Sequence, residues 1–469
     1  MLCSGGLNPV SSEAQRLFLE GVGHMDEENN DEARLAFIAA LELAPDFAEA
    51  HGNLGMVQEV QGELAEAELH QRRAIELSPQ QPEFHLNLGA LLVKQKRLSE
   101  AEIPCRQALL LAPNSPRAWS NFGVFLACTG RASEAEQSYR TAMAIDPSYR
   151  TARHNLAYLL LRDERYDEGW ECLEARSMYE PLARQLACPR WQGEPLQDKS
   201  LLIGLETGHG DMIQFCRYAR LAKEAGAARV SVVCHAALKT LFLTLDGIDE
   251  VIGANESFPA SGWDFWTPPM SFPFFFKTRH DSIPARVPYL KAEPDAVRRW
   301  AEEISSTPSH PRVGIVWRGN PRFENDADRS LPSPAVLASL ADVPGAAFFS
   351  LQKGPTAEDE RALAAYLPCV TLGHQLSNFA ETAAVIENLD IVLTVDTAVA
   401  HLAGALGRPC WLLLPAFKTD WRWLLDRDDS PWYPEGMRLF RQQAPGDWAP
   451  VLARVVAELK KLADSTPCR

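Results

Sequence analysis

A 34-residue pattern recurs five times at the start of this 469-residue chain. The copies run over 14–47, 48–81, 82–115, 116–149 and, incompletely, 150–176. A small residue marks the eighth position of every copy: Gly21, Gly55, Gly89, Gly123 and Ala157. A proline marks the thirty-second position of the four complete copies: Pro45, Pro79, Pro113 and Pro147. Small residues let two helices pack closely, and the proline ends the second helix, so each copy predicts one helical hairpin.

This period and these positions are typical of the tetratricopeptide repeat. We therefore predict an α superhelix of such repeats over residues 13–180, after an N-terminal tail at 1–12. An array of this kind is curved, and its concave surface commonly binds another protein.

The composition excludes several classes of protein. No apolar run approaches the roughly 20 residues of a membrane-spanning helix, and the N-terminus has no signal-peptide pattern, so we expect a cytoplasmic protein without a transmembrane segment. The 10 cysteines include no C-x-x-C pair, which favours reduced thiols over disulfides or zinc. Most of the net charge of −16 lies in residues 1–180. Acidic repeats argue against nucleic acid, and they suit a neutral or basic partner segment or simply solubility.

Beyond a proline-containing hinge at 178–191, apolar runs alternate with helical periods. This alternation predicts βαβ units and parallel sheets. We expect two Rossmann-like domains, at 181–306 and 307–469, with a cleft between them, and we expect 255–290 to finish the first sheet with strands and loops. The expected strands are 200–206, 229–235, 250–253, 312–317, 346–351, 369–372, 390–395 and 409–414. The expected helices are 211–226, 236–245, 293–304, 333–341, 357–366, 379–388, 397–406 and 447–462.

Ligands of such sheets bind beyond the carboxyl ends of the strands, and polar motifs follow four of the expected strands. The clearest is Asp396-Thr397-Ala398, where a strand ends and a helix begins. Thr397 and the free N–H groups of that first turn can hold a phosphate, and Asp396 can cap the helix or accept ribose hydroxyls. His401 lies one turn further on the same face. An N-cap beside a buried histidine explains these residues equally well.

A second motif, Glu206-Thr-Gly208-His-Gly210-Asp211, follows the first strand of the α/β region. Its two glycines permit a tight turn and a close backbone approach to a ligand. Asp211 would then lie at the mouth of the cleft, where a carboxylate can act as a general base. A plain turn with a helix N-cap is the competing interpretation.

Two more loops carry basic and amide side chains. Arg318, Asn320 and Arg329 follow the strand at 312–317, and the two arginines can neutralise a diphosphate. Gln352 and Lys353 follow the strand at 346–351. The D-x-D spacings at 326–328 and 426–428 are weak metal signals in so acidic a chain, and we expect no metal and no cofactor.

Taken together, these motifs resemble bacterial proteins that join tetratricopeptide repeats to a GT-B glycosyltransferase domain. The resemblance rests on Pro189–Gly193, Gly208–Phe215, Val316–Pro321, Arg329–Pro332, Ser350–Gly354, Asp396–His401 and Asp420–Trp423. The α/β part also resembles the lipopolysaccharide heptosyltransferases of family 9. The overall plan is similar to O-linked N-acetylglucosamine transferase.

The resemblance implies a sugar transfer from a nucleotide-sugar donor to a protein acceptor. It makes Asp211 the catalytic base, places Arg329 and Lys353 near the donor diphosphate, and places Asp396, Thr397 and His401 around the nucleotide. The full set expected to bind donor is Gly208, Gly210, Arg318, Asn320, Arg329, Gln352, Lys353, Asp396, Thr397, Ala398 and His401. The resembled proteins commonly have Glu-Gln-Gly-x-Gly-Asp in the first loop, so Thr207, which stands in place of the glutamine, puts the donor preference in question.

The repeats also carry a ladder of asparagines at equivalent positions. The sixth position of four successive copies is asparagine: Asn53, Asn87, Asn121 and Asn155. Side-chain amides both donate and accept, so this ladder can bind the backbone of an extended acceptor peptide. Consensus packing explains it as well. Two other functions stay open: a nucleotide-binding scaffold without catalysis, and a glycosyltransferase that acts on lipid or polysaccharide.

Overall fold

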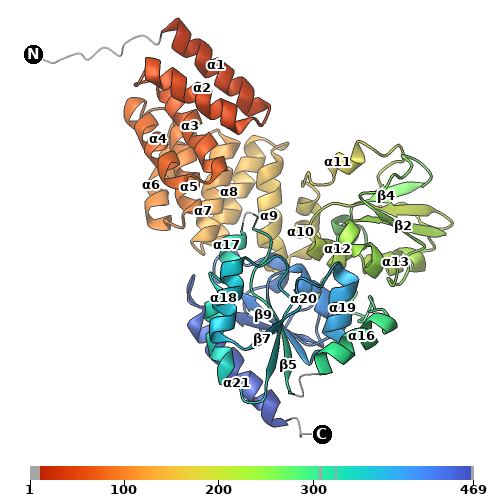
Figure 1. The fold of residues 1–469 in the computed structure, drawn as a ribbon. Helices are drawn as coiled ribbons and strands as arrows, with labels where there is room; N and C mark the ends of the chain where they lie inside the picture. Colours follow the sequence, from red (N-terminus) through yellow and green to blue (C-terminus); the bar gives the residue numbers. More distant parts are fainter. Residues whose placement is uncertain (1–10, 306–308, 322, 324, 466–469) are drawn as a thin grey trace, which may run out of the picture. The chain divides into compact units, whose positions relative to one another are not determined.

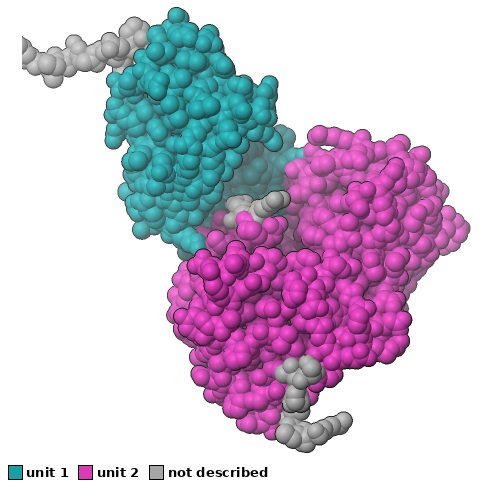
Figure 2. All heavy atoms as spheres, in the orientation of Figure 1, with its two compact units in different colours: residues 1–159 teal, residues 160–469 magenta. Residues whose placement is uncertain are grey.

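The computed structural model describes residues 11–305, 309–321, 323 and 325–465. The chain divides into two compact units, residues 1–159 and 160–469, which Figure 2 colours teal and magenta. The predicted tail at 1–12 lies almost wholly outside the described residues. Among those residues, none of the helices combines the length and the apolar character needed to cross a bilayer.

The first unit is a stack of helical hairpins, one for each of the four complete predicted repeats (Figure 1). The superhelical class predicted from the 34-residue period is confirmed. The paired helices are α1 (Ser12–Asp26) with α2 (Asn30–Leu43), α3 (Ala48–Gln61) with α4 (Leu64–Leu77), α5 (Pro82–Lys94) with α6 (Leu98–Leu111), and α7 (Pro116–Cys128) with α8 (Ala132–Ile145). Helix α9 (Arg150–Arg162) opens the fifth repeat and crosses the boundary between the units.

The marker residues of the repeat act as the sequence predicted. A Cβ atom added to Gly89 would lie 2.6 Å from Cys105 Sγ, and one added to Gly123 would lie 2.5 Å from Tyr139 Cε1. Any side chain there would drive the two helices of a hairpin apart. The second helix of each complete repeat ends two residues before its proline, as α2 does before Pro45.

The second unit contains two parallel sheets. The first has the order β3-β2-β1-β4 and the second the order β10-β9-β8-β5-β6-β7. The strands of the first are β1 (Ser200–Ile203), β2 (Arg229–Cys234), β3 (Glu250–Gly253) and β4 (Phe265–Thr267). Those of the second are β5 (Arg312–Val316), β6 (Ala347–Ser350), β7 (Cys369–Thr371), β8 (Ile391–Val395), β9 (Cys410–Leu414) and β10 (Met437–Arg441). Two parallel sheets confirm the predicted α/β architecture of GT-B type.

Helices connect these strands. Those of the first half are α11 (Glu180–Ala183), α12 (His209–Phe215), α13 (Tyr218–Glu224), η1 (Ala236–Leu238), α14 (Lys239–Phe242), η2 (Pro269–Ser271), α15 (Phe272–Phe275), η3 (His280–Ser282) and α16 (Pro294–Ser305). Those of the second half are α17 (Asp326–Arg329), η4 (Pro334–Asp342), α18 (Ala357–Tyr366), α19 (Phe379–Glu387), α20 (Ala398–Ala405), η5 (Trp421–Trp423) and α21 (Ala449–Ser465). A core under the second sheet includes Val313, Ile391, Leu393 and Val455.

Several elements differ from the sequence-based prediction. The helix expected over 236–245 is the short pair η1 and α14, and the segment 255–290, expected as strands and loops, contains η2, α15 and η3 besides β4. The helix expected over 211–226 is the two helices α12 and α13, and at their junction the Arg217 guanidinium donates to the Gln214 carbonyl at 2.9 Å. Strand β10 was not predicted. The segment expected as an α-helix at 333–341 is the 3₁₀ helix η4.

The second helix of the fifth repeat, α10 (Tyr166–Leu173), is packed within the second unit. Trp170 is buried there, donates to the Thr278 carbonyl at 2.8 Å and meets the Trp421 ring edge-on at 5.3 Å. Just after α10, the buried Arg176 guanidinium pairs with Glu206, the residue that opens the predicted catalytic loop. The repeat pattern therefore ends inside the α/β unit, while the domain limits predicted at 180 and 306 stay predictions.

Candidate active site

The structure brings several of the predicted site residues to one edge of the second sheet. Strands β8, β5 and β6 are neighbours in that sheet, so the residues that follow them share its carboxyl edge. Thr397 is the N-cap of α20, and its hydroxyl lies 3.0 Å from that of Thr394. Since the Thr397 side chain does not cap the helix, the N–H groups of Ala398 and Val399 are available to an anion, whereas that of Ala400 donates to the Thr397 carbonyl at 3.0 Å.

Gln352 joins the loops that follow β5 and β6. Its Oε1 accepts hydrogen bonds from the backbone N–H groups of Trp317 at 3.1 Å and Arg318 at 3.0 Å, and its Nε2 donates to the Arg318 carbonyl. Arg318 itself donates to Asp359 Oδ1 at 2.6 Å, and Lys353 donates to the Leu376 carbonyl. These three predicted donor ligands already have protein partners, so Gln352 shapes the loop, and the two cations would have to exchange partners to meet a diphosphate.

Arg329 lies closer to the edge of β8. It donates to Asp326 Oδ1 at 3.2 Å and lies over the Phe323 ring at 4.4 Å, and its charge acts on both Asp396 and His401. Asn320, in the same loop, is exposed. Asp326, the first aspartate of the D-x-D motif at 326–328, therefore forms an ion pair with Arg329. Within the described ranges, no three His, Cys, Asp or Glu side chains come together as a metal site would require.

The loop after β1 lies directly against α20. Gly208 is the N-cap of α12, and Asp211 lies in the first turn of that helix. A Cβ atom at Gly210 would lie 2.9 Å from His401 Cδ2 and 3.5 Å from Ala398 Cα. The two strongest sequence motifs, one from each sheet, are therefore in contact at a single site.

A third segment, the loop after β9, completes this site, and no role for it was predicted. Arg422 of η5 donates to Asp211 Oδ1, to Gln214 Oε1 at 2.5 Å and to both oxygens of Asp420. The segment Asp420–Trp423 carries part of the family resemblance, but nothing local in the sequence indicates that its arginine reaches a helix 211 residues away.

The carboxylate and imidazole at α20 have unusual acid–base properties. Burial and the neighbouring Asp420 carboxylate raise the pKa of Asp396 to about 6. Burial, reinforced by the positive charge of Arg422, lowers the pKa of His401 well below its ordinary value. His401 is therefore neutral near pH 7. Its Nδ1 lies 2.9 Å from the Tyr433 hydroxyl, and its ring stacks on that of Trp423 with 5.3 Å between the ring centroids.

The asparagine ladder of the repeats is not uniform. Asn87 is buried, and its Oδ1 accepts from Arg117 of the next repeat at 3.1 Å. Asn155 Nδ2 lies 3.5 Å from Ser120 Oγ. Asn53 and Asn121 are half-buried, and neither side chain has a hydrogen bond within the described structure. These two are the members of the ladder whose side-chain amides have no hydrogen-bond partner there.

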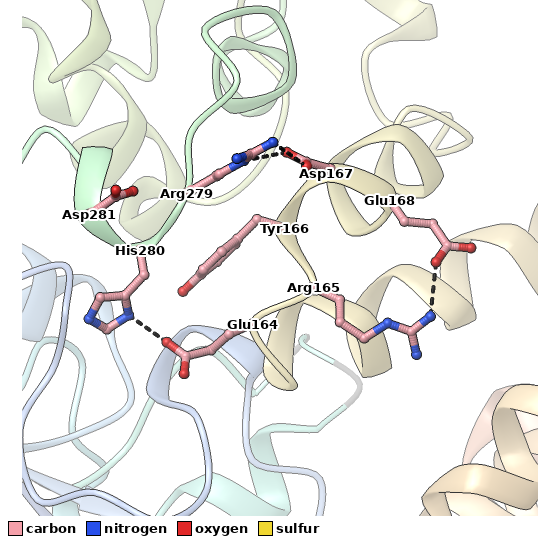
Figure 3. Close-up of a pocket in the computed structure, with 8 residues that line it drawn as sticks. All are labelled: Glu164, Arg165, Tyr166, Asp167, Glu168, Arg279, His280 and Asp281. Carbon is pink, nitrogen blue, oxygen red and sulfur yellow. Dashed lines mark hydrogen bonds and ion pairs between the residues drawn. The ribbon is translucent and has the colours of Figure 1, made fainter.

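A separate hollow of about 410 Å³ lies at the start of α10 (Figure 3). An ion pair from Arg279 to Asp167 and a hydrogen bond between His280 and Glu164 cross the hollow. None of the predicted site residues lines this hollow.

Comparison with known proteins agrees with the division of the chain. Residues 18–82 and 61–120 match tetratricopeptide repeat families, and residues 347–412 match glycosyltransferase family 9 (heptosyltransferase). The matched part of the second unit runs from β6 to the start of β9 and includes Asp396 and His401. The chain thus carries tetratricopeptide repeats at its N-terminus and a family 9 glycosyltransferase domain in its C-terminal part.

One curated relative is the protein FlbA of Caulobacter vibrioides, which is 27% identical over 336 residues. The match covers 66% of this chain and 55% of FlbA, so the chain spans little more than half of that relative. Two solved structures are similar to part of this chain. One is pilF of Pseudomonas aeruginosa, with 22% identity, 35% of this chain and 74% of that chain covered, and a TM-score of 0.32. The other is the thermophilic repeat protein TTC0263 of Thermus thermophilus, with 22% identity, 34% of this chain and 89% of that chain covered, and a TM-score of 0.33.

Proposed function

We propose that this protein transfers a sugar from a nucleotide-sugar donor to a hydroxyl group of a protein acceptor that its repeats bind. The observation that carries the proposal is the contact between the Gly208–Asp211 loop and the start of α20. It brings a carboxylate and a phosphate-binding helix N-terminus, from different sheets, to one site. The family 9 match supports a glycosyltransferase, and the repeats support a protein partner.

The proposed chemistry needs one base and one anion site. The acceptor oxygen attacks the anomeric carbon, the bond from that carbon to the diphosphate oxygen breaks, and the proton passes to the Asp211 carboxylate. The open N–H groups of α20, with Arg329 nearby, stabilise the charge of the departing nucleoside diphosphate. Attack from the face opposite the leaving group inverts the anomeric configuration. The residues supply both functions without a metal ion.

Neutral His401 suits this site. A protonated imidazole would be repelled by the nearby Arg422, Arg217 and Arg329, whereas a neutral one packs on Trp423 and Tyr433 and supports the start of α20. We expect its role at the donor to depend on shape and hydrogen bonding rather than on charge.

The test is donor hydrolysis over a panel of nucleotide sugars, with the wild-type chain and Asp211→Asn. Asparagine keeps the shape of the side chain and removes its basicity. It should therefore lower the turnover number by about 10²–10⁴-fold. Binding of the matching nucleoside diphosphate, measured by calorimetry, should change little. The matched control is Asp342→Asn, an exposed aspartate at the end of η4.

Each contrary result has a distinct meaning. Normal turnover in Asp211→Asn would assign the base elsewhere, and a product of retained configuration would contradict the inverting mechanism. Nucleotide binding without turnover of any donor would instead support the scaffold alternative. Turnover with lipid or polysaccharide acceptors but not with proteins would remove the protein acceptor from the proposal.

A further inference from the structure

Arg422 is the most completely engaged cation at the site. Its side chain is 7% exposed, and it lies in the short 3₁₀ helix η5 after β9. Its Nε donates to Gln214 Oε1 at 2.5 Å, and its Nη1 donates to Asp420 Oδ2 at 2.9 Å and Oδ1 at 3.0 Å. Its Nη2 donates to Asp211 Oδ1. One guanidinium therefore ties the second sheet to the helix that carries the proposed base.

The guanidinium plane is also fixed by aromatic rings. Its central carbon lies 4.6 Å from the Trp421 ring centroid and 5.5 Å from that of Phe215. Trp421 in turn meets Trp170 of α10 at 5.3 Å. Burying a cation is costly unless its hydrogen-bond donors find acceptors, and here carboxylates and an amide are arranged to receive them. Such a setting leaves Arg422 little freedom to move.

The two oxygens of Asp211 are in different situations. Oδ1 is held by Arg422, whereas Oδ2 lies beside Gly208 and has no hydrogen-bond partner among the described residues. The Asp211 side chain is 26% exposed. One oxygen is thus anchored, and the other is available to a hydroxyl group on the open side of the site.

We infer that Arg422 is a positioning residue for the transfer reaction: it orients the Asp211 carboxylate so that Oδ2 faces the acceptor hydroxyl. The inference rests on the proposed role of Asp211 as the base. It also implies that the base is correctly oriented only when the loop after β9 is docked on α12. The role is distinct from donor binding, since the guanidinium donates its hydrogen bonds to Asp211, Gln214 and Asp420.

The test compares Arg422→Met, Arg422→Lys, Asp211→Asn and the double variant Asp211→Asn/Arg422→Met. The readouts are donor hydrolysis, with the nucleotide sugar turned over fastest by the wild type, and calorimetric binding of UDP, GDP, ADP and dTDP. Arg422→Met should lower the turnover number about 10- to 100-fold, because a misdirected base reacts poorly. The nucleoside diphosphate dissociation constant should change less than about threefold. Lysine should recover part of the loss. The double variant should be no slower than Asp211→Asn alone, since both changes disable the same group.

Arg427→Met is the matched control, because Arg427 lies five residues further along and pairs with the exposed Asp429. It should leave turnover unchanged. If Arg422→Met does not fold, Asp420→Asn removes one anchor of the guanidinium and should give a smaller loss of turnover with unchanged nucleotide binding.

Two results would overturn the inference while leaving the proposed function intact. One is an equal, multiplicative loss from Arg422→Met in the Asp211→Asn background, which would show that Arg422 acts independently of the base. The other is a tenfold or larger weakening of nucleoside diphosphate binding, which would make Arg422 a donor ligand. Full activity of Asp211→Asn by itself would instead remove the base assignment, and the positioning role with it.

Discussion

At the scale of single residues, the site contains a glycine with no room for a side chain and a carboxylate buried near another carboxylate. Gly210 leaves no space for a side chain against His401, and Asp396 is a carboxylate kept near a second carboxylate, Asp420. Both arrangements are unfavourable for stability alone. Residues in such surroundings are commonly found where a ligand is bound or a reaction is catalysed.

Gly210→Val should weaken the contact between α12 and α20. The new Cβ would lie 2.9 Å from His401 Cδ2, and that ring is buried and cannot move aside. We expect a destabilisation of about 1–3 kcal/mol and a loss of donor hydrolysis of at least about tenfold. Thermal unfolding and steady-state kinetics measure the two effects. Gly23→Ala, where no heavy atom lies within 4 Å, is the control. Wild-type kinetics in Gly210→Val would show that the two motifs need not meet for catalysis.

Asp396 should make stability depend on pH in the weakly acidic range. Its pKa is raised to about 6 in the folded protein, whereas it is about 3.9 in an unfolded chain. The folded state therefore binds a proton that the unfolded state has released. The stabilisation is full below the unfolded value and is lost as the pH rises through about 6. Asp396→Asn cannot lose a proton, so it should not lose stability in this way as the pH rises. The melting temperature of the variant minus that of the wild type should therefore increase from pH 4 to pH 7. A constant difference across that range would contradict the raised pKa.

At the scale of elements, α10 is a repeat helix that packs inside the second unit. It has the position of a repeat helix in the sequence, yet its buried face meets Thr278, Trp421 and Trp432 of the second unit. Arg176, just after it, satisfies the buried Glu206 carboxylate. The pKa of Glu206 is raised by burial in spite of that arginine, so the pair is needed to keep the charge buried.

Trp170→Ala should therefore destabilise the α/β unit. Removing a buried tryptophan leaves a cavity that costs about 3–5 kcal/mol, and the Thr278 carbonyl loses its donor. The temperature at which donor hydrolysis is lost should fall clearly. Trp119→Ala is the matched control, because Trp119 makes the same kind of bond to a carbonyl, that of Pro113, within the first unit. Equal effects of the two variants on hydrolysis would show that α10 belongs energetically to the repeats.

At the scale of the whole molecule, the chain combines tetratricopeptide repeats with a part that matches glycosyltransferase family 9. Binding energy from groups remote from the reacting atoms can raise the rate with a protein acceptor without changing the reaction with water. The two activities of the proposed enzyme can therefore be separated by mutation.

Asn53→Ala/Asn121→Ala should make this separation. These two asparagines have no side-chain hydrogen bond within the described structure, so their loss removes no internal hydrogen bond. At about 0.5–1.5 kcal/mol for each hydrogen bond, turnover of a protein acceptor should fall about tenfold while donor hydrolysis stays the same. Asn114→Ala, at an exposed position between repeats, serves as the control. If the double variant modifies its protein acceptor normally, the asparagines do not bind the acceptor and are explained by the consensus packing of the repeat.

The sequence by itself determined the parts of this protein that depend on local order. The repeat hairpins follow from a 34-residue period, because helix pairing between neighbours uses contacts close in the chain, as between Gly89 and Cys105. The strand-to-helix turns at Asp211 and Asp396 follow from the alternation of apolar runs with polar loop residues. Each motif could also be expected at the carboxyl edge of its own sheet, where ligands of such sheets bind.

Only the tertiary structure decided what surrounds those motifs. The contact between Asp211 and Arg422 spans 211 residues, and the assignment of α10 to the α/β unit depends on partners more than 100 residues away, such as Thr278. The break between α12 and α13, where the buried Arg217 donates to the Gln214 carbonyl, was not predicted, and neutral His401 follows from burial beside arginines. Burial and long-range pairing set the energies of charged groups, and neither is encoded in the local spacing of residues.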